Sequence, residues 1–222
     1  MIVAVIPARG GSKRLADKNL QLLGGRPLVA WSIQSALRAA AVDLCFVSTD
    51  SPAIAAAARE AGAEVLDRPE ALSGDLTPTV DVLAHAIAAL DAEGRAPDLV
   101  VTLQPTSPFR PEGFIDAAVA RLEDGVSAVM SVSPVSAKFG RIVDGLFRPS
   151  YAPGTRGQDL EPLFREDGVV YVSRAEAIRA ANDMFGAAVA AFVTPRPWGL
   201  VDIDDAQDLA LAEALAAVLS LA

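Results

Sequence analysis

Short apolar runs rich in β-branched residues alternate along the chain with longer segments whose apolar positions recur at helical spacing. This pattern predicts strands near 2–6, 43–48, 63–66 and 98–103 and helices over 27–40, 52–61 and 79–91. Ser51 followed by Pro52 is a start signal for the second helix, and Gly62 is its stop signal. Strands joined by helices imply right-handed crossovers, so we expect an α/β fold with a largely parallel sheet and ligands at the carboxyl ends of its strands.

The alternation fails after a predicted helix at 112–122 and a predicted strand at 126–133. Residues 135–165 are rich in Pro, Gly and Arg and carry scattered aromatic side chains, namely Phe139, Phe147, Tyr151 and Phe164. An apolar strand then resumes at 168–172. A long irregular segment within a compact domain is usually functional or an element of assembly. We therefore expect one domain over 1–222 with an inserted arm at about 135–165.

Composition narrows the classes of function. The net charge of −9 argues against non-specific binding to nucleic acid or to an anionic membrane. The opening apolar run is too short for a transmembrane helix and lacks the pattern of a signal peptide, so we expect a cytoplasmic protein. The single Cys45 lies in an apolar run and is expected in the core, while the single His85 is expected to pair with Asp81 on a helix surface. One histidine excludes a His-based triad or metal cluster, so the chemistry must use carboxylates, cations and a bound metal ion.

A basic, glycine-bearing loop follows the first strand. Gly10 and Gly11 can turn backbone N–H groups toward one point, and the cations around them include Arg9, Lys13 and Lys18. These features favour a polyanion, most simply a nucleoside triphosphate, although the spacing is neither GxxxxGK[ST] nor GxGxxG. The alternative is a strand-to-helix turn whose Lys and Arg side chains are only solvated.

Polar residues follow the predicted strands at their carboxyl ends. Asp50 and Gln104 each come directly after an apolar run, and for Asp50 a turn or cap role and a role in the site wall are equally open. Asp202 and Asp204 are separated by one residue in an extended context, so both carboxylates project to the same face and suit Mg²⁺. Asp204, with Gln207 three residues later and an apolar helix over 206–219, also fits the N-cap of a capping box. A cap explains Asp204 but not Asp202.

Several of these segments together resemble a known family. The run from Ile6 to Arg14 (IPARGGSKR), followed by Lys18-Asn19-Leu20, is similar to the amino-terminal signature of the CMP-sialic acid synthetases, or acylneuraminate cytidylyltransferases. Four further segments match in order: Val47-Ser48-Thr49-Asp50, Arg68-Pro69-Glu70-Ala71-Leu72 with Asp75 and Thr77, Leu103 to Arg110 (LQPTSPFR), and Val201-Asp202-Ile203-Asp204. The resemblance covers essentially the whole chain, and the first segment together with the Gln-Pro-Thr-Ser-Pro run is its specific part.

The resemblance implies a three-layer Rossmann-like nucleotidyltransferase fold, similar to glycosyltransferase-A, with the arm used for homodimerisation. It implies that CTP and a nine-carbon 2-keto sugar acid give a CMP-sugar and pyrophosphate, with Mg²⁺ as cofactor. The implied nucleotide-binding residues are Arg9, Gly11, Ser12, Lys13, Lys18, Asn19, Arg68, Thr77 and Thr79. The implied sugar-binding residues are Gln104, Arg165 and, from the arm, Lys138 or Arg141. The implied catalytic residues are Arg9, Lys18, Asp202 and Asp204, of which the last two hold the metal.

One departure from the family bears on the substrate. Where many members read Arg-Pro-Asn-Gly, this chain has Arg165-Glu166-Asp167-Gly168, which adds negative charge beside the expected position of an anionic sugar. A transferase for another sugar, such as keto-deoxyoctulosonic acid, and a non-catalytic nucleotide-binding relative therefore stay open as alternatives. A binding module has no need of metal carboxylates, so Asp202 together with the basic loop favours the enzyme.

Overall fold

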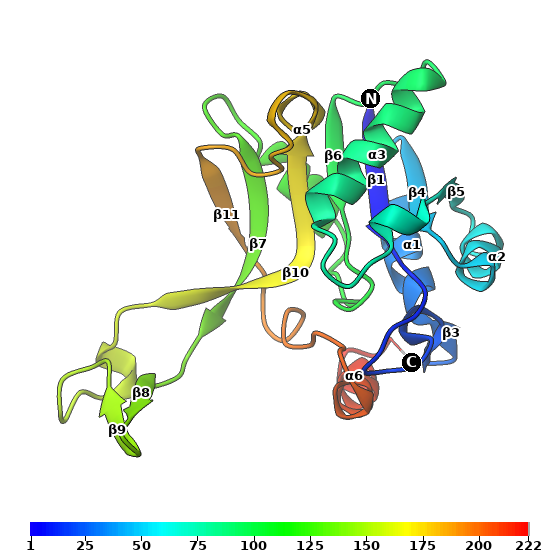
Figure 1. Cartoon of the computed structure of the whole chain (residues 1–222). Coiled ribbons are helices and arrows are strands. Elements are labelled where there is room, and N and C mark those ends of the chain that lie inside the picture. Colours follow the sequence, from blue (N-terminus) through cyan, green and yellow to red (C-terminus); the bar gives the residue numbers. More distant parts are fainter. Residues whose placement is uncertain (222) are drawn as a thin grey trace.

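A central seven-stranded sheet organises the chain in the computed structural model, which describes residues 1–221 (Figure 1). Its strands, in the spatial order of the sheet, are β11 (Val189–Val193), β7 (Ala128–Val135), β10 (Leu163–Arg174), β6 (Leu99–Thr102), β1 (Ile2–Pro7), β4 (Leu44–Thr49) and β5 (Glu64–Asp67). The pairs along β6-β1-β4-β5 and the pair β11-β7 are parallel, and only β10 runs antiparallel to its two neighbours. The predicted α/β fold with a mostly parallel sheet is therefore confirmed.

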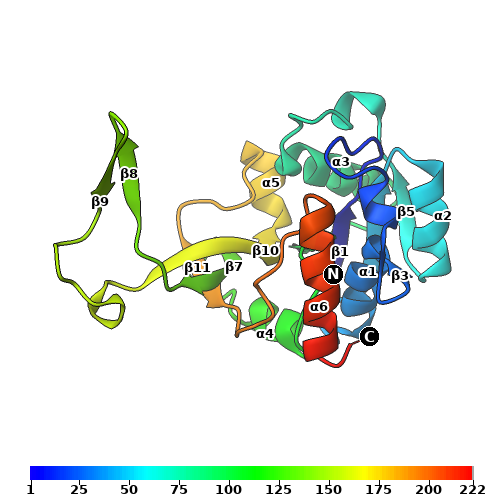
Figure 2. The ribbon, with the colours of Figure 1, turned by 90° about the horizontal axis from the view of Figure 1, so that it is seen from below.

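Helices cover both faces of this sheet and make three layers. Side chains of α1 (Leu28–Arg38), α2 (Pro52–Glu60) and α4 (Phe114–Ala120) form one buried cluster with one face of the strands. Side chains of α3 (Thr79–Ala92) and α5 (Ala175–Ala181) form a second cluster with the other face. The view from below shows α3 and α5 on one side of the sheet and α1 and α4 on the other (Figure 2). The strands are buried on both faces because successive side chains alternate between the two clusters, as Ala4 and Val5 do.

A third apolar cluster fixes the end of the chain beneath the sheet. Leu215 of helix α6 (Ala206–Val218) is buried in one apolar cluster with Trp31 of α1 and with Leu23 of the small hairpin formed by β2 (Leu22–Leu23) and β3 (Arg26–Pro27). Ile203, just before α6, is fully buried in the same cluster, and its N–H donates to the carbonyl oxygen of Thr106 at 2.8 Å. The segment that carries Asp202 and Asp204 is thereby held beside the loop that follows β6.

The cap of α6 differs from the prediction by one residue. Asp205, not Asp204, is the N-cap: its carboxylate accepts from the N–H groups of Gln207 at 2.8 Å and Asp208 at 3.0 Å. Asp208 completes the capping box by accepting from the N–H of Asp205 at 3.1 Å. Because Asp205 supplies the cap, the carboxylate of Asp204 is available for other partners.

The predicted arm contains more regular structure than its composition suggested. β7 and β10 run on beyond the sheet and lead to a hairpin of β8 (Gly140–Val143) and β9 (Leu146–Pro149), with a short 3₁₀ turn at Gly157–Asp159, and the whole segment projects from the body (Figures 1 and 2). Asp144 (φ 51°) and Gly145 (φ 76°) form the two-residue turn, and an Asp-Gly pair is a strong hairpin signal in a sequence. The strand predicted from 168 begins at Leu163 instead, because its first residues pair with the end of β7.

Two predictions about single side chains have different outcomes. Cys45 is buried, as expected, and burial raises the pKa of its thiol to about 12. The expected pair between His85 and Asp81 is wrong: in the described residues Nδ1 of His85 is buried without a hydrogen-bond partner, and Asp81 accepts from the side-chain amide of Asn182 at 2.6 Å. Within residues 1–221, none of the helices has the length and apolar content needed to cross a membrane.

Candidate active site

A cleft of about 320 Å³ opens where β1 and β6 end, bounded by the start of α3 and by the segment before α6. This is the edge of the sheet at which the parallel topology predicts a ligand site. The predicted residues that line it are Arg9, Ser12, Lys18, Asn19, Arg68, Thr77, Thr79, Gln104, Asp202 and Asp204. Gly11 and Lys13 belong to the same basic loop but do not line the cleft itself.

The basic loop is fixed from behind by Asp50. The N–H of Gly10 donates to Asp50 Oδ1 at 2.8 Å, so this N–H is not free to bind an anion as the sequence suggested. A Cβ on Gly10 would lie 3.2 Å from Cβ of Ser51, and Gly11 has a φ of +63° that favours glycine. The amide of Asn19 donates to the carbonyl oxygen of Arg9 at 3.0 Å. Asp50 therefore neither caps α2, which Ser51 does, nor lines the cleft; it positions the loop.

Arg68 forms a buried part of the cleft wall. Its guanidinium donates to the carbonyl oxygen of Ser48 at 2.6 Å and to the hydroxyl of Ser48 at 3.2 Å. Burial lowers the pKa of Arg68, against the opposing effect of Asp50. Thr79 and Val82, from the first turn of α3, line the neighbouring wall, and the positive end of a helix dipole favours negative charge there.

The two predicted metal carboxylates face the same cleft. Asp202 and Asp204 alternate with Val201 and Ile203, which are buried in the cluster around α6. Asp204 accepts from Lys18 Nζ at 3.0 Å and pairs with Arg14 at 2.8 Å. Burial acts to raise the pKa of Asp204, but Lys18 and Arg14 outweigh it and hold that pKa below its ordinary value.

This donor set suits magnesium better than a transition metal. No group of three or more His, Cys, Asp or Glu side chains with metal-site geometry occurs in the described part of the chain. Magnesium is commonly bound by one or two carboxylates, with water and substrate phosphates completing its shell. Asp202 and Asp204 would therefore hold a magnesium ion as its two carboxylate ligands, with water and substrate phosphates as the others.

Asp75 is a cleft residue to which sequence reasoning gave no role. Its carboxylate pairs with Arg9 Nη2 at 2.5 Å through one oxygen and with Lys13 Nζ at 2.5 Å through the other. The hydrogen bond and charge of Lys13, together with Arg9, hold the pKa of Asp75 below its ordinary value. Asp75 belongs to the family-matching segment that begins at Arg68. Its ion pairs join residues more than sixty positions apart, so the sequence around Asp75 does not indicate them.

Gln104 is held on both its backbone and its side chain. Its carbonyl oxygen accepts from Arg110 Nη2 at 3.0 Å and from the hydroxyl of Ser32 at 3.3 Å. Its side chain lies against Gly168, where a Cβ would come 2.3 Å from Gln104 Oε1. Burial lowers the pKa of Arg110 to about 9, opposed by the charge of Asp167. The buried Arg110 thus ties the loop after β6 to its neighbours.

The remaining predicted sugar-binding residues do not line this cleft. Arg165 donates from Nη2 to the carbonyl oxygen of Gly199. Lys138 donates to the carbonyl oxygen of Thr155 at 2.6 Å. Arg141 is exposed on β8. The cleft therefore gathers the predicted nucleotide and metal residues, but within one copy of the chain it leaves the arm cations outside.

The extra acidic residues of the 165–168 segment are engaged within the protein. Asp167 is buried, and its carboxylate accepts from the hydroxyls of Ser131 at 2.5 Å and Ser133 at 2.7 Å. Glu166 accepts from the hydroxyl of Tyr171. Neither carboxylate lines the cleft, and the expected effect of this negative charge on the sugar acid stays a prediction.

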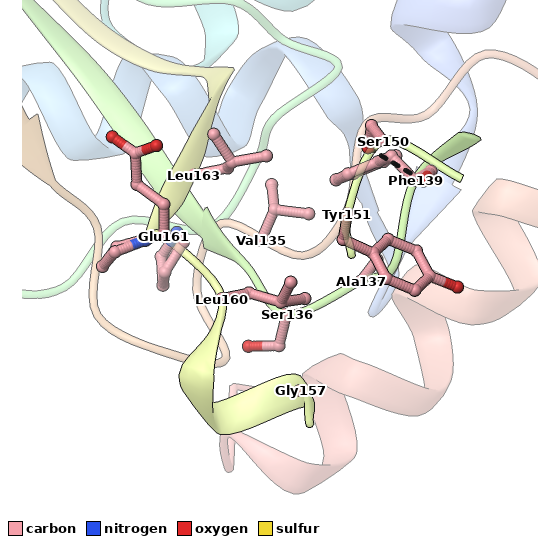
Figure 3. A pocket seen from close by; sticks show the side chains of 12 residues that line it. Val135, Ser136, Ala137, Phe139, Ser150, Tyr151, Gly157, Leu160, Glu161 and Leu163 are labelled. Atoms are coloured by element: carbon pink, nitrogen blue, oxygen red, sulfur yellow. Dashed lines mark hydrogen bonds between the residues drawn. The ribbon is translucent and has the colours of Figure 1, made fainter. Parts of the chain in front are cut away.

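A second cavity, of about 500 Å³, lies at the base of the arm. Val135, Leu160 and Leu163 point toward one another across it, and the hydroxyl of Ser150 donates to the carbonyl oxygen of Phe139 at 2.9 Å (Figure 3). No Lys or Arg is among the described residues that line it. It is larger than the cleft, yet it lacks the paired cations and carboxylates that phosphoryl chemistry requires.

Comparisons with known proteins agree with the geometry of the cleft. A family model described as cytidylyltransferase matches residues 3–178. The chain is 37% identical over 230 residues to CMP-N,N'-diacetyllegionaminic acid synthase of Legionella pneumophila, covering 96% of this chain and 95% of that protein. It is 32% identical to N-acylneuraminate cytidylyltransferase of Escherichia coli, covering 95% of this chain and 51% of that protein.

A solved structure of CMP:2-keto-3-deoxy-manno-octonic acid synthetase complexed with CTP is similar to the whole chain. The two superpose with a TM-score of 0.70 at 20% identity, and the match covers 98% of this chain and 99% of the other. At this identity the similarity supports the fold, and the three-layer arrangement agrees with it.

Proposed function

The chain belongs to the cytidylyltransferase family, and we propose that it transfers CMP from CTP to a nonulosonic acid, a nine-carbon 2-keto sugar acid, with release of pyrophosphate. The observation that carries the proposal is that one cleft gathers Arg9 and Lys18 of the basic loop with Asp202 and Asp204 from the far end of the chain. The relative that matches over 96% of this chain is named for the synthesis of a CMP-nonulosonic acid.

In the proposed reaction, the basic loop binds the triphosphate. Arg9, Lys13 and Lys18 neutralise the charge that develops on departing pyrophosphate, which is electrostatic work suited to fixed cations, and the hydroxyl of Ser12 donates to the same phosphates. Asn19, Arg68, Thr77 and Thr79 hold the cytidine. The anomeric hydroxyl of the sugar attacks the α-phosphorus, and the enzyme lowers the barrier largely by aligning the two reactants.

The cofactor in this proposal is Mg²⁺, held by Asp202 and Asp204, and it would supply charge neutralisation for the phosphates. Lys18 then has two tasks, because its ammonium both pairs with Asp204 and lies beside the expected phosphates. The burial of Val201 and Ile203 supports this assignment, since both carboxylates are anchored by the same apolar cluster.

The sugar acid is proposed to lie between Gln104 and Arg165. Arginine offers a planar fork for a carboxylate, and Arg165 stands on β10 where that strand enters the arm. Lys138 and Arg141 would reach a site only in a second copy of the chain, so we propose a homodimer in which each arm completes its neighbour. Exposed apolar side chains on the arm, among them Ile142 and Phe147, support an interface there.

We propose that the reaction takes place in the cytoplasm, where CTP is available. The test is release of pyrophosphate from CTP with Mg²⁺ across a panel of sugar acids: legionaminic, sialic, pseudaminic and keto-deoxyoctulosonic acid. We expect turnover with at least one nonulosonic acid and little with keto-deoxyoctulosonic acid. Preference for the eight-carbon sugar would reassign the substrate, and absence of pyrophosphate with every sugar would contradict the catalytic proposal.

The nucleotide half can be tested separately by thermal unfolding. A ligand that binds only the native state raises the melting temperature by mass action. We therefore expect CTP to raise the melting temperature much more than ATP, GTP or UTP does. Equal shifts with all four nucleotides would contradict the assignment of CTP.

A further inference from the structure

The nucleotide cleft already contains an anion of its own, the carboxylate of Asp75. Its two oxygens lie 2.5 Å from Arg9 Nη2 and 2.5 Å from Lys13 Nζ. These are two of the cations that the proposed function assigns to the triphosphate. A carboxylate that bridges two cations uses the same donors as a phosphate group would, so a bound polyphosphate and Asp75 cannot both have them.

The segment that carries Asp75 is held by few other contacts. Leu76, the next residue, is 95% exposed, so burial of its side chain does almost nothing to hold the segment. In the described part of the chain, the hydrogen bonds and ion pairs of residues 74–77 are the pairs to Arg9 and Lys13 and one bond from the N–H of Thr77 to the carbonyl oxygen of Gly74 at 3.3 Å. Once an arriving anion takes the two cations, little else opposes movement of the segment.

We propose that Asp75 is an internal competitor that sets how tightly the cleft holds CTP and its product pyrophosphate. The inference rests on the proposed function, because it takes Arg9 and Lys13 as phosphate ligands. Any polyphosphate that uses these cations must first displace Asp75, so the apparent affinity of each such ligand is reduced by the same factor. A ligand that does not reach the two cations, such as cytidine, is not penalised.

A tethered carboxylate of this kind helps the product to leave. Because Asp75 is attached to the chain beside the site, its effective concentration stays high whatever the ligand concentration outside. As pyrophosphate dissociates from Arg9 and Lys13, Asp75 returns to them and shields the cations from rebinding. The inhibition constant of pyrophosphate is therefore higher than it would be without Asp75.

The test is the variant Asp75→Asn, which keeps the size of the side chain and removes its charge. Titration calorimetry with inorganic pyrophosphate, CTP and cytidine, each in buffer with Mg²⁺, measures the three dissociation constants. We expect the Kd of pyrophosphate and of CTP to fall about fivefold, in keeping with the modest strength of half-exposed ion pairs, while that of cytidine is unchanged. The inhibition constant of pyrophosphate in the steady-state assay should fall by the same factor.

The matched control is Glu70→Gln. Glu70 is an exposed carboxylate five residues before Asp75, and it makes no ion pair in the described structure. Its removal changes the net charge by the same amount without freeing Arg9 or Lys13, so we expect unchanged constants. An equal gain in both variants would reduce the effect to overall charge and overturn the role of Asp75.

Two further outcomes are distinguishable. If wild-type protein binds CTP and pyrophosphate but Asp75→Asn binds them equally or more weakly, Asp75 orients the cations and does not compete, and the inference is rejected while the proposed function stands. If wild-type protein binds neither ligand, the cleft is no triphosphate site, and the proposed function fails together with the inference.

Discussion

The basic loop and the arm are both surface segments rich in charged residues, yet the fold supports them differently. The loop is fixed within its own chain: Asp50 accepts from Gly10, Asn19 donates to Arg9, and Asp204 pairs with Lys18. Among the described residues, the two strands of the arm hairpin pair only with each other, and Ile142 is 78% exposed and Phe147 56% exposed. Catalytic charges need positions set in advance, whereas an apolar surface of this kind is stable only when another surface covers it.

The largest effect is expected at the carboxylates that face the basic loop, and Asp202→Asn tests it. The change preserves shape but removes a hard anionic ligand, so we expect kcat to fall at least ~100-fold while the melting temperature is nearly unchanged. The control is Asp205→Asn in the same segment, which should keep both kcat and the helix, because Asn caps a helix about as well as Asp. Near-normal turnover of Asp202→Asn at saturating Mg²⁺ would show that this carboxylate is not a metal ligand.

The arm is tested by placing charge on its apolar surface. Ile142 and Phe147 are cross-strand partners, and the double variant Ile142→Asp, Phe147→Asp should weaken self-association about thirtyfold or more, as loss of an interface hot spot does. Sedimentation equilibrium over a dilution series measures the constant, and the Kd for CTP should not change.

The control for this double variant is Arg148→Gln, which changes a charged residue of the same hairpin and leaves Ile142 and Phe147 unchanged. A wild-type chain that sediments as a monomer at micromolar concentration would contradict the dimer directly.

Arg165 stands between the two regions, on the strand that leads from the body into the arm. Arg165→Met should raise the KM for the sugar acid at least ~tenfold, equivalent to about 1.4 kcal/mol, with the KM for CTP unchanged. Arg165→Lys should recover only part of the loss, because a point charge does not replace the guanidinium fork. If the KM for the sugar stays at its wild-type value, the carboxylate is bound elsewhere, and Lys138 and Arg141 become the residues to test.

The smallest expected effect concerns the ion pairs that hold the carboxylate segment to the loop. Lys18 and Arg14 lower the pKa of Asp204, so its contribution to stability is fully present above the ordinary pKa of 3.8 and is lost as pH falls through the lower folded value. Asp204→Asn should therefore reduce the free energy of unfolding by about 0.5–1 kcal/mol at pH 7, a range typical of partly exposed pairs.

The difference between wild type and Asp204→Asn should vanish at the acid end of a denaturation series. Chemical unfolding at several pH values measures this difference in the free energy of unfolding. The control is the neighbouring variant Asp205→Asn, which keeps the helix cap. A difference that grows as pH falls would mean that the pKa of Asp204 is raised on folding, opposite to the sign expected from its cationic partners.

The sequence alone determined the alternating strands and helices, the basic loop after β1 and the pair of carboxylates on one face before α6. These features follow from local periodicity and residue type, which act over a few positions. Two errors of the sequence analysis were also local. The cap of α6 was placed one residue too early, because neighbouring carboxylates compete for the same N–H groups. The Asp-Gly hairpin in the arm was missed, because its strands lie in a segment of polar composition.

Only the tertiary structure decided which charges meet. Asp75 with Arg9, Lys18 with Asp204, and Asp167 with two serine hydroxyls each join residues that lie far apart along the chain. The physical reason is that an ion pair depends on distance in space, and nothing in the spacing of residues along a strand or helix records which distant side chain the fold will bring within 3 Å.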